Sequence, residues 1–570
     1  MSSPIFIVLQ RLRYPLLLLV IVYSVLILVF TIIPGVDDKG NPWTMSFFHA
    51  FYFVSFMGST IGFGEIPYPF SDGQRFWALF GIYASVISWL YSIGRLLQII
   101  KDPAFQLVLT ESMFSKRVNR INEPFYLICG YGDTGKLLAR GLSELDIRCV
   151  VLDKSQQRID DLAIEENDIN IPSLCANAIF PEVLELAGLK HPKCVGVLAL
   201  THDNQVNLKI AITSKLLSKN INVISRADTN DVMANMDSFD TDHIINPYQM
   251  FAKRLALAIR SPEAYLVYEW FTNADHRLID EPPVIPKGKW LICGYGRFGK
   301  SVSQYLEYEG IRTKIVEARP QQTDAPGDVV VGSGTEAITL KDAGIMDASG
   351  VVAGTDNDSN NLSIIMTAKE IKKHHKIFTV ARQNYHRNSR VFDAAELDLV
   401  MQPAIIVVRE ILALIKTPLL SEFLTLVTQQ KKDWINILIS RLSGIFDSDT
   451  PHVWTVSTSS LKSSSVKKMI SEDHICIEDL LKNINNRDRK LSCLALFIKN
   501  KHHGYKLLPD LDQIIEVGDE ILFCGDHVSE DSIHALLKYD YMLRYVKDGT
   551  SYRKGYVWNY FFGSNKPGIN

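Results

Sequence analysis

The segment TIGFGE at positions 60–65 combines two closely spaced glycines with a hydroxyl before them and a carboxylate after them. Gly62 and Gly64 tolerate positive φ at little steric cost, so alternating backbone conformations can aim successive carbonyl oxygens to one side. Stacked carbonyl oxygens can replace the water around a potassium ion. Since one chain supplies one carbonyl per ring, this chemistry requires several copies of the chain around an axis.

Two glycine-rich stretches, GYGDTG at 130–135 and GYGRFG at 294–299, indicate a different chemistry. Each follows a buried apolar run and opens an amphipathic helix, and the strand after it ends in a carboxylate. In this order the glycines bring backbone amides close to a pyrophosphate at the helix N-terminus, and the carboxylate can accept ribose hydroxyls. The candidate cofactor-binding residues are Gly130, Gly132, Asp133, Thr134, Gly135 and Asp153 in the first copy, and Gly294, Gly296, Arg297, Phe298, Gly299 and Glu317 in the second.

Charged residues indicate which of the two expected pockets suits a diphosphate better and which nucleotide it would bind. Arg297 can pair with a phosphate, whereas Asp133 at the matching place would repel one, so the second copy suits a diphosphate better. Asp153 and Glu317 would repel a 2′-phosphate, which favours NAD or ADP. The second stretch also fits a P-loop, but the first copy has Leu137 where that motif needs a hydroxyl, so we favour the dinucleotide reading.

The carbonyl segment lies between two apolar runs, because positions 14–35 and 76–94 contain no charged residue. We expect transmembrane helices at about 14–35 and 76–100, and a pore helix at 44–57 that is too short to span the bilayer. A backbone that returns inside the membrane must be buried in protein or line water, which favours a pore over a tight turn between two anchors. A cleaved signal peptide is the alternative for the first run, but its length and the second span favour a retained helix.

Basic residues on the flanks indicate the orientation. Arg11 and Arg13 precede the first span, and Arg95 and Lys101 follow the second, so both termini should be cytoplasmic in a multi-pass protein of the inner (plasma) membrane. With 60 basic and 63 acidic residues, no overall field recruits nucleic acid. The eight cysteines include no C-x-x-C pair, which fits a reducing compartment, and we expect Cys129 and Cys293 to be buried thiols.

The chain beyond the membrane part is duplicated. Beside the glycine stretches, TxxxxxN recurs at 201–207 and 355–361, and helical pairs follow Pro247 and Pro403. The expected fold is an all-α membrane pore followed by an α/β part with two Rossmann-like domains, helical crossovers and a C-terminal α+β lobe. We expect a pore domain at 1–100, a linker at 101–122, a first Rossmann-like domain with crossover helices at 123–273, a second at 288–428 and the lobe at 429–560.

These motifs carry a family resemblance. TIGFGE resembles the potassium-channel signature T-V-G-Y-G-D, and the preceding WTMSFFHAFYF resembles a pore helix. With the duplication, the chain resembles prokaryotic two-transmembrane potassium channels with tandem RCK (regulator of potassium conductance) domains, gated by several ligands. Phe63 lacks the bracing hydroxyl of the signature tyrosine, and Glu65 replaces its aspartate.

The resemblance implies a homotetramer in the lipid bilayer that a ring of RCK domains opens or closes on binding NAD or ADP. It implies a selectivity filter at Thr60, Ile61, Gly62, Phe63 and Gly64, with potassium held at the first four. Ala84 stands where a hinge glycine is expected, so the helix could bend at Gly81 or Gly94 on either side of it. Gly94 and Leu97 are the gate candidates. The resemblance does not imply an enzyme.

Calcium is a further candidate ligand, because some relatives bind it and four acidic residues cluster in the C-terminal part. They are Glu472, Asp473, Glu478 and Asp479. They do not have EF-hand spacing, so a solvated acidic face is the competing interpretation. Two other functions remain open: a membrane-anchored NAD-dependent oxidoreductase, and the regulatory subunit of a potassium transporter.

Overall fold

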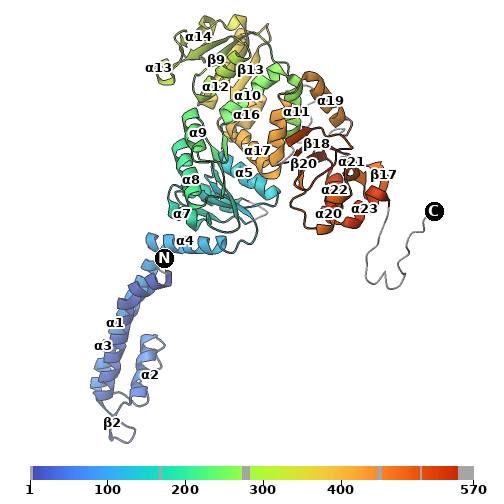
Figure 1. The fold of residues 1–570 in the computed structure, drawn as a ribbon. Coiled ribbons are helices and arrows are strands. Elements are labelled where there is room, and N and C mark those ends of the chain that lie inside the picture. The colour runs from blue at the N-terminus through green and yellow to red at the C-terminus, as the bar shows by residue number, and fades with distance from the viewer. Residues whose placement is uncertain (1–3, 166–169, 273–282, 446–451, 501–503, 550–570) are drawn as a thin grey trace, which may run out of the picture. The chain divides into compact units, whose positions relative to one another are not determined.

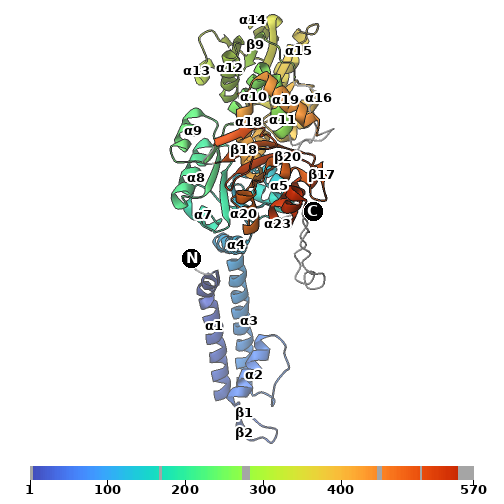
Figure 2. The same ribbon diagram turned by 45° about the vertical axis from the view of Figure 1, so that its right-hand side comes forward.

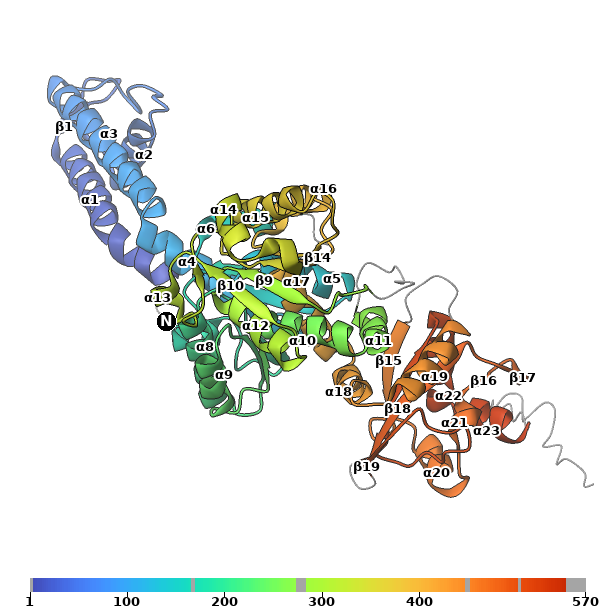
Figure 3. The same cartoon turned by 90° about the horizontal axis from the view of Figure 1, so that it is seen from above.

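The computed structural model describes residues 4–165, 170–272, 283–445, 452–500 and 504–549. They divide into two compact units, the first formed mainly by Met1–Asn122 and the second by most of the remaining chain (Figures 1, 2 and 3).

The first unit is built on two long helices that lie side by side, α1 (Pro4–Ile32) and α3 (Asp72–Ile100), with the shorter α2 (Phe47–Gly58) beside them (Figure 2). The segments Leu12–Ile32 and Asp72–Ile100 are long and apolar enough to cross a membrane. A two-stranded sheet of β1 (Pro34–Val36) and β2 (Pro42–Thr44) follows α1.

Local signals explain where these helices begin and end. α1 ends just before Pro34, because a proline disfavours helical conformation in the residue that precedes it. α2 begins after Ser46, whose side chain accepts from the backbone N–H of His49, and α3 begins with a capping box between Ser71 and Gln74. The expected linker contains a further helix, α4 (Pro103–Val118), which Asp102 caps.

The second unit begins with a six-stranded sheet in the order β5-β4-β3-β6-β7-β8, in which β4, β3, β6, β7 and β8 run parallel. This is the strand order of doubly wound dinucleotide-binding folds. The strands are β3 (Phe125–Cys129), β4 (Arg148–Asp153), β5 (Ser173–Cys175), β6 (Cys194–Ala199), β7 (Asn222–Arg226) and β8 (His243–Ile245). The helices between them are α5 (Asp133–Glu144), α6 (Gln156–Ile164), α7 (Pro181–Leu186), α8 (Asn204–Leu217) and α9 (Asn230–Asp237).

A second six-stranded parallel sheet repeats this order as β11-β10-β9-β12-β13-β14, which confirms the predicted duplication. Its strands are β9 (Lys289–Cys293), β10 (Thr313–Glu317), β11 (Val330–Val331), β12 (Ala348–Ala353), β13 (Phe378–Arg382) and β14 (Leu399–Met401). Its helices are α12 (Arg297–Tyr308), α13 (Pro320–Thr323), α14 (Ala337–Asp342), α15 (Asp358–Ile371) and α16 (Ser389–Ala394), with 3₁₀ turns η1 (Ile345–Asp347) and η2 (His386–Asn388).

The two domains exchange the helices that follow their sheets. α10 (Pro247–Arg260) follows the first sheet but packs against α12 of the second domain, and α17 (Pro403–Lys416) follows the second sheet but packs against α5 of the first. α11 (Pro262–Thr272) and α18 (Pro418–Val427) complete the two helical pairs. The exchange gives the domains shared cores, with Val407 and Ile411 packed among residues of the first domain.

The C-terminal lobe contains a four-stranded antiparallel sheet in the order β15-β20-β18-β19. Its strands are β15 (His452–Ser457), β18 (Cys493–Asn500), β19 (Gly504–Leu507) and β20 (Glu520–Gly525), and a hairpin joins β16 (Lys482–Asn483) to β17 (Asn486–Lys490). The helices are α19 (Lys432–Ser443), α20 (Ser464–Glu472), α21 (Ile477–Leu480), α22 (His527–Lys538) and α23 (Asp540–Asp548). Positions 550–560 of the expected lobe lie outside the described residues.

All eight cysteines are free thiols, and Cys129 and Cys293 are fully buried, as predicted. Burial raises the pKa of the Cys293 thiol to about 12. These thiols are therefore packing groups of the two first strands.

Candidate functional site

The loop after α2 has the backbone alternation that its glycines predicted. Thr60, Gly62 and Gly64 have φ values of 61°, 66° and 97°, so every second residue is left-handed. Positive φ is unfavourable for a β-branched residue such as Thr60, and strain of this kind is typical of functional sites. The loop is tied to the end of α2 by the N–H of Ile61, which donates to the carbonyl of Phe56 at 3.0 Å.

Side chains of this loop lack cover within a single chain. Ile61 and Phe63 are 61% and 64% exposed. Phe63, which cannot form the hydrogen bond of a tyrosine, instead packs edge-on against Phe56 with ring centroids 5.5 Å apart. Glu65 accepts from the backbone N–H of Phe70 and pairs with Arg75, both at 2.8 Å, and so anchors the end of the loop.

Both gate candidates lie on an uninterrupted α3. Gly94 has open space where a Cβ would stand, and Leu97 is 52% exposed. Gly81 has a different role, because a Cβ there would come within 2.9 Å of Met57. Gly81 is therefore a close-packing position between α3 and α2, whereas a side chain at Gly94 would meet no neighbour.

The first glycine-rich stretch forms one wall of a cavity of about 710 Å³. Gly130 has φ 108°, and Gly132 precedes α5, so backbone N–H groups at the start of this helix face the cavity. Of the predicted residues, Gly130, Gly132, Asp133, Thr134 and Asp153 line it. Gly135 packs instead: a Cβ there would lie 2.0 Å from the carbonyl oxygen of Gly130.

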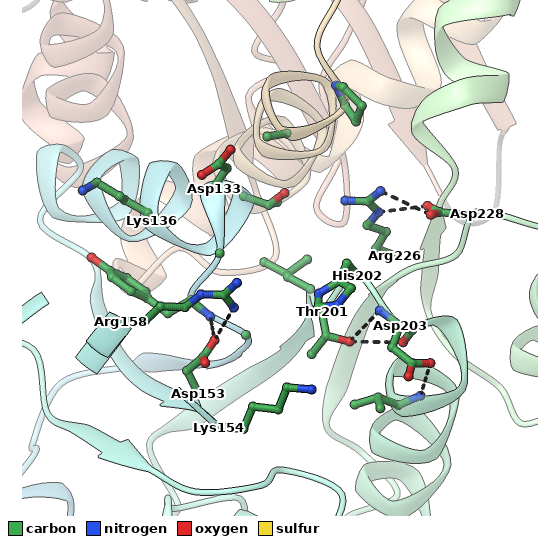
Figure 4. Close-up of a pocket in the computed structure, with 18 of the residues that line it drawn as sticks. Asp133, Lys136, Asp153, Lys154, Arg158, Thr201, His202, Asp203, Arg226 and Asp228 are labelled. Carbon is green, nitrogen blue, oxygen red and sulfur yellow. Dashed lines mark hydrogen bonds and ion pairs between the residues drawn. The ribbon is translucent and has the colours of Figure 1, made fainter. Parts of the chain in front are cut away.

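Asp153 has partners within the protein. Its carboxylate accepts from the backbone N–H groups of Tyr131 at 2.6 Å and Ser155 at 2.8 Å, and from the Arg158 guanidinium at 3.2 Å. Figure 4 shows Arg158 beside Asp153 in the pocket, and Arg226 paired with Asp228 elsewhere in it. The carboxylate therefore braces the glycine loop and also stands at the pocket wall.

Three arginines surround the buried Tyr248 in this pocket. Arg382 donates to the Tyr248 hydroxyl at 3.0 Å, and Arg297 lies 5.5 Å from the centre of its ring. Burial by itself lowers the pKa of the Arg226 guanidinium, but the carboxylate of Asp228 and the Tyr248 hydroxyl outweigh it, so the net shift is upward. Arg226 therefore remains a permanent cation.

Two of these arginines come from the second domain. Arg297 pairs with Asp228 at 2.7 Å, and Arg382 pairs with Asp356 at 2.5 Å. Arg382 Nε is buried and has no hydrogen-bond partner within the described residues. In return, Asp133 of the first domain accepts from the backbone N–H of His386 at 3.3 Å.

A cavity of about 450 Å³ lies at the second glycine-rich stretch. Gly294, Gly296 and Glu317 line it, and Glu317 accepts from the Tyr295 N–H at 2.7 Å, which repeats the Asp153 contact. The other predicted residues of this copy lie elsewhere. Phe298 is fully buried in the core, and Arg297 lines the first cavity. Gly299 packs on Gly294, where a Cβ would lie 2.0 Å from the Gly294 carbonyl oxygen.

Sequence reasoning missed Arg158, Asp228 and Tyr248 as pocket residues. Arg226 and Arg382 had a signal in the sequence, since each is the last residue of the fifth strand of its copy. Asp203 caps α8, and Asn207 bridges Thr201 and Arg226, so both residues have structural roles.

Three of the four acidic residues proposed for calcium are paired with lysines. Asp479 pairs with Lys482 at 2.8 Å, and Glu478 pairs with Lys490 at 3.2 Å. Glu472 pairs with a lysine one turn earlier, at 3.7 Å. Calcium needs six to eight oxygen ligands, and the described residues give no support to a calcium site here.

Comparison with known proteins agrees with this architecture. The TrkA-N domain description matches residues 126–247 and 290–403, which are the two Rossmann-like domains. The ion channel description matches residues 16–102. The chain is thus a membrane protein with an ion-channel pore domain followed by two TrkA-N (RCK) domains, which places it among ion channels rather than oxidoreductases.

Two relatives come from Methanocaldococcus jannaschii. Potassium channel protein 1 is 23% identical over 217 residues, covering 38% of this chain and 63% of the relative. Probable potassium channel protein 2 is 23% identical over 239 residues, covering 42% of this chain and 64% of the relative. The matches therefore span less than two thirds of these relatives.

A solved structure, the GsuK channel bound to NAD, aligns with 94% of this chain and 99% of its own, at 15% identity and a TM-score of 0.45.

Proposed function

We propose that four copies of this chain form a potassium channel whose opening is controlled by NAD or ADP in the first pocket. The observation that carries the proposal is the left-handed backbone at Thr60, Gly62 and Gly64, between two helices that can each cross a membrane. The names of the two archaeal relatives support potassium as the ion.

The filter chemistry follows from the backbone. Alternating conformations allow the carbonyls of Thr60, Ile61, Gly62 and Phe63 to face one axis and replace water around the ion. The exposed side chains of Ile61 and Phe63 then find cover against neighbouring chains. A tetramer is the assembly that supplies four carbonyls per ring.

The first pocket, rather than the second that the sequence favoured, suits a nucleoside diphosphate, because Arg297 lines the first cavity. Backbone N–H groups at the start of α5 are placed to receive phosphate oxygens. Asp153 stands at the ribose position with its Tyr131 contact in place. Arg297 and Arg382 supply positive charge opposite the glycine loop, and the unpartnered Nε of Arg382 is a donor that an anionic ligand would satisfy.

Control of the pore follows from the mixed origin of this pocket. A ligand that contacts Gly132 of the first domain and Arg297 of the second binds most tightly to the arrangement of the two domains in which both residues contact it. Such a preference commonly amounts to about 1–3 kcal/mol per coupled site, so the sites of four chains must add. α4 joins the pocket-bearing unit to the end of α3, and we propose that the gate at Gly94 and Leu97 responds through it.

We propose that both termini face the cytoplasm, because basic residues flank the outer ends of the two spans. This topology places the nucleotide pockets in the compartment that contains NAD and ADP.

Potassium flux into proteoliposomes tests the proposal. The full-length chain should pass potassium, and NAD or ADP should change the rate, while NADP should act more weakly because Asp153 opposes a 2′-phosphate. A flux that is insensitive to nucleotides would reject the sensor, and the absence of flux with every ligand would reject the pore.

A further inference from the structure

A cluster of imidazoles and one carboxylate lies in the C-terminal lobe, apart from both nucleotide pockets. His452 begins β15 and is paired in register with Gly525 at the end of β20. The chain turns directly from β20 into α22, so His527 in the first turn of that helix comes over His452, with ring centroids 4.1 Å apart.

Glu530 lies at the centre of this cluster. Its carboxylate is 2.7 Å from His452 Nε2 and 3.6 Å from His527 Nδ1. His534, one turn further along α22, places Nε2 3.8 Å from the other carboxylate oxygen. His527, Glu530 and His534 share one face of the helix, because they stand three and four residues apart.

We propose that His452, His527 and Glu530 bind a divalent transition-metal ion of the zinc type, with His534 or water in the fourth position. One donor atom from each of the three lies within 4.8 Å of the others. Donors at about 2.0–2.1 Å from a tetrahedral zinc ion stand about 3.3 Å apart, so small side-chain rotations suffice.

The donor set decides the class of ion. Imidazole nitrogen with a single carboxylate suits zinc and its neighbours in the first transition row. Calcium and magnesium prefer oxygen ligands and would find too few here. His527 is 79% exposed while His452 is 15% exposed, so an ion can enter from the solvent side and seat on the sheet.

One charged group opposes the ion. Lys416, at the end of α17, places Nζ 3.4 Å from His452 Nδ1. A metal on Nε2 requires a proton on Nδ1, and the ammonium group disfavours that tautomer. The same contact links the proposed site to the helix that packs on the first domain.

Metal titration of the detergent-solubilised full chain, after removal of metals by a chelator, tests the site. Cobalt should give the visible absorption of a tetrahedral site, and zinc should displace it. His527→Gln should lower zinc affinity by about 10–100-fold or more, as should Glu530→Gln. His474→Gln, an exposed histidine of the same lobe, should leave affinity unchanged.

A loss of zinc affinity in His527→Gln would not come from unfolding, because the His527 side chain is exposed and its replacement leaves the core intact. Lys416→Met should strengthen binding by removing the opposing charge. The inference is overturned if the wild type shows no tetrahedral cobalt spectrum, if His527→Gln binds zinc as the wild type does, or if Lys416→Met weakens binding.

Discussion

At the scale of single residues, the glycines of the two glycine-rich stretches divide into two roles. Gly135 and Gly299 have no room for a Cβ, since it would lie 2.0 Å from a carbonyl oxygen. Gly132 and Gly296 have room, with nothing closer than 3.8 Å, and their φ values of −80° and −76° suit any residue. In the dinucleotide-binding motif a glycine at this place lets the backbone approach a phosphate, and we propose the same role for Gly132 and Gly296.

Alanine substitutions separate these roles. Gly299→Ala should destabilise the second domain by about 1–3 kcal/mol or more, because a backbone oxygen must move. Gly132→Ala should leave thermal unfolding unchanged and weaken ADP binding, which calorimetry on the full chain would measure. Retained ADP affinity in Gly132→Ala would exclude phosphate binding at the first stretch.

Arg297 is the second residue with a specific expectation. It lines the first pocket and pairs with Asp228, which Arg226 also neutralises. Arg297→Gln should therefore leave the fold intact and lower ADP affinity about tenfold or more, since a hydrogen bond to a charged group contributes about 1.5–3 kcal/mol.

The matched control for this substitution is Lys300→Gln, one turn along the same helix, where the side chain pairs with Asp324 at 3.6 Å and lies 5.8 Å from the centre of the Tyr295 ring. Equal ADP affinity in both variants would show that Arg297 does not contribute to ADP binding.

At the scale of elements, α3 contains one glycine that is packed against a neighbouring helix and one that has open space around it. Gly81 fits against Met57, whereas a Cβ at Gly94 meets nothing within 4 Å. Gly94→Ala should stabilise the straight helix by up to about 1 kcal/mol. If α3 bends at Gly94 to open the pore, this substitution lowers the open probability in single-channel recordings. An unchanged open probability would move the hinge elsewhere.

Local sequence signals predicted most of the elements. The apolar runs predicted both spans, and the repeated glycine spacing predicted both doubly wound domains. The sequence assigned Arg297 to the pocket of its own glycine stretch, but it faces the other domain. The reason is long-range: α10 packs on α12 and brings Tyr248 and Asp228 to Arg297, and no local pattern encodes this exchange of helices.

At the scale of the whole chain, the exchange of α10 and α17 joins the two domains through shared cores. A ligand in the first pocket therefore touches groups of both. This is what a gating device requires, because a ligand shifts an equilibrium only by its differential affinity for the two states. The segment from Thr60 to Gly64, in contrast, leaves the side chains of Ile61 and Phe63 exposed in one chain, and we propose that further copies of the chain cover them.

The central claim is that four chains turn the main-chain oxygens of Thr60 to Phe63 toward one axis. Cryo-electron microscopy of the full-length protein, purified from membranes in potassium, tests it most directly. We expect fourfold symmetry through the membrane helices and ion density on the axis between successive oxygen rings. A dimer, or a fourfold assembly whose filter oxygens face away from an axis without ion density, would contradict the account.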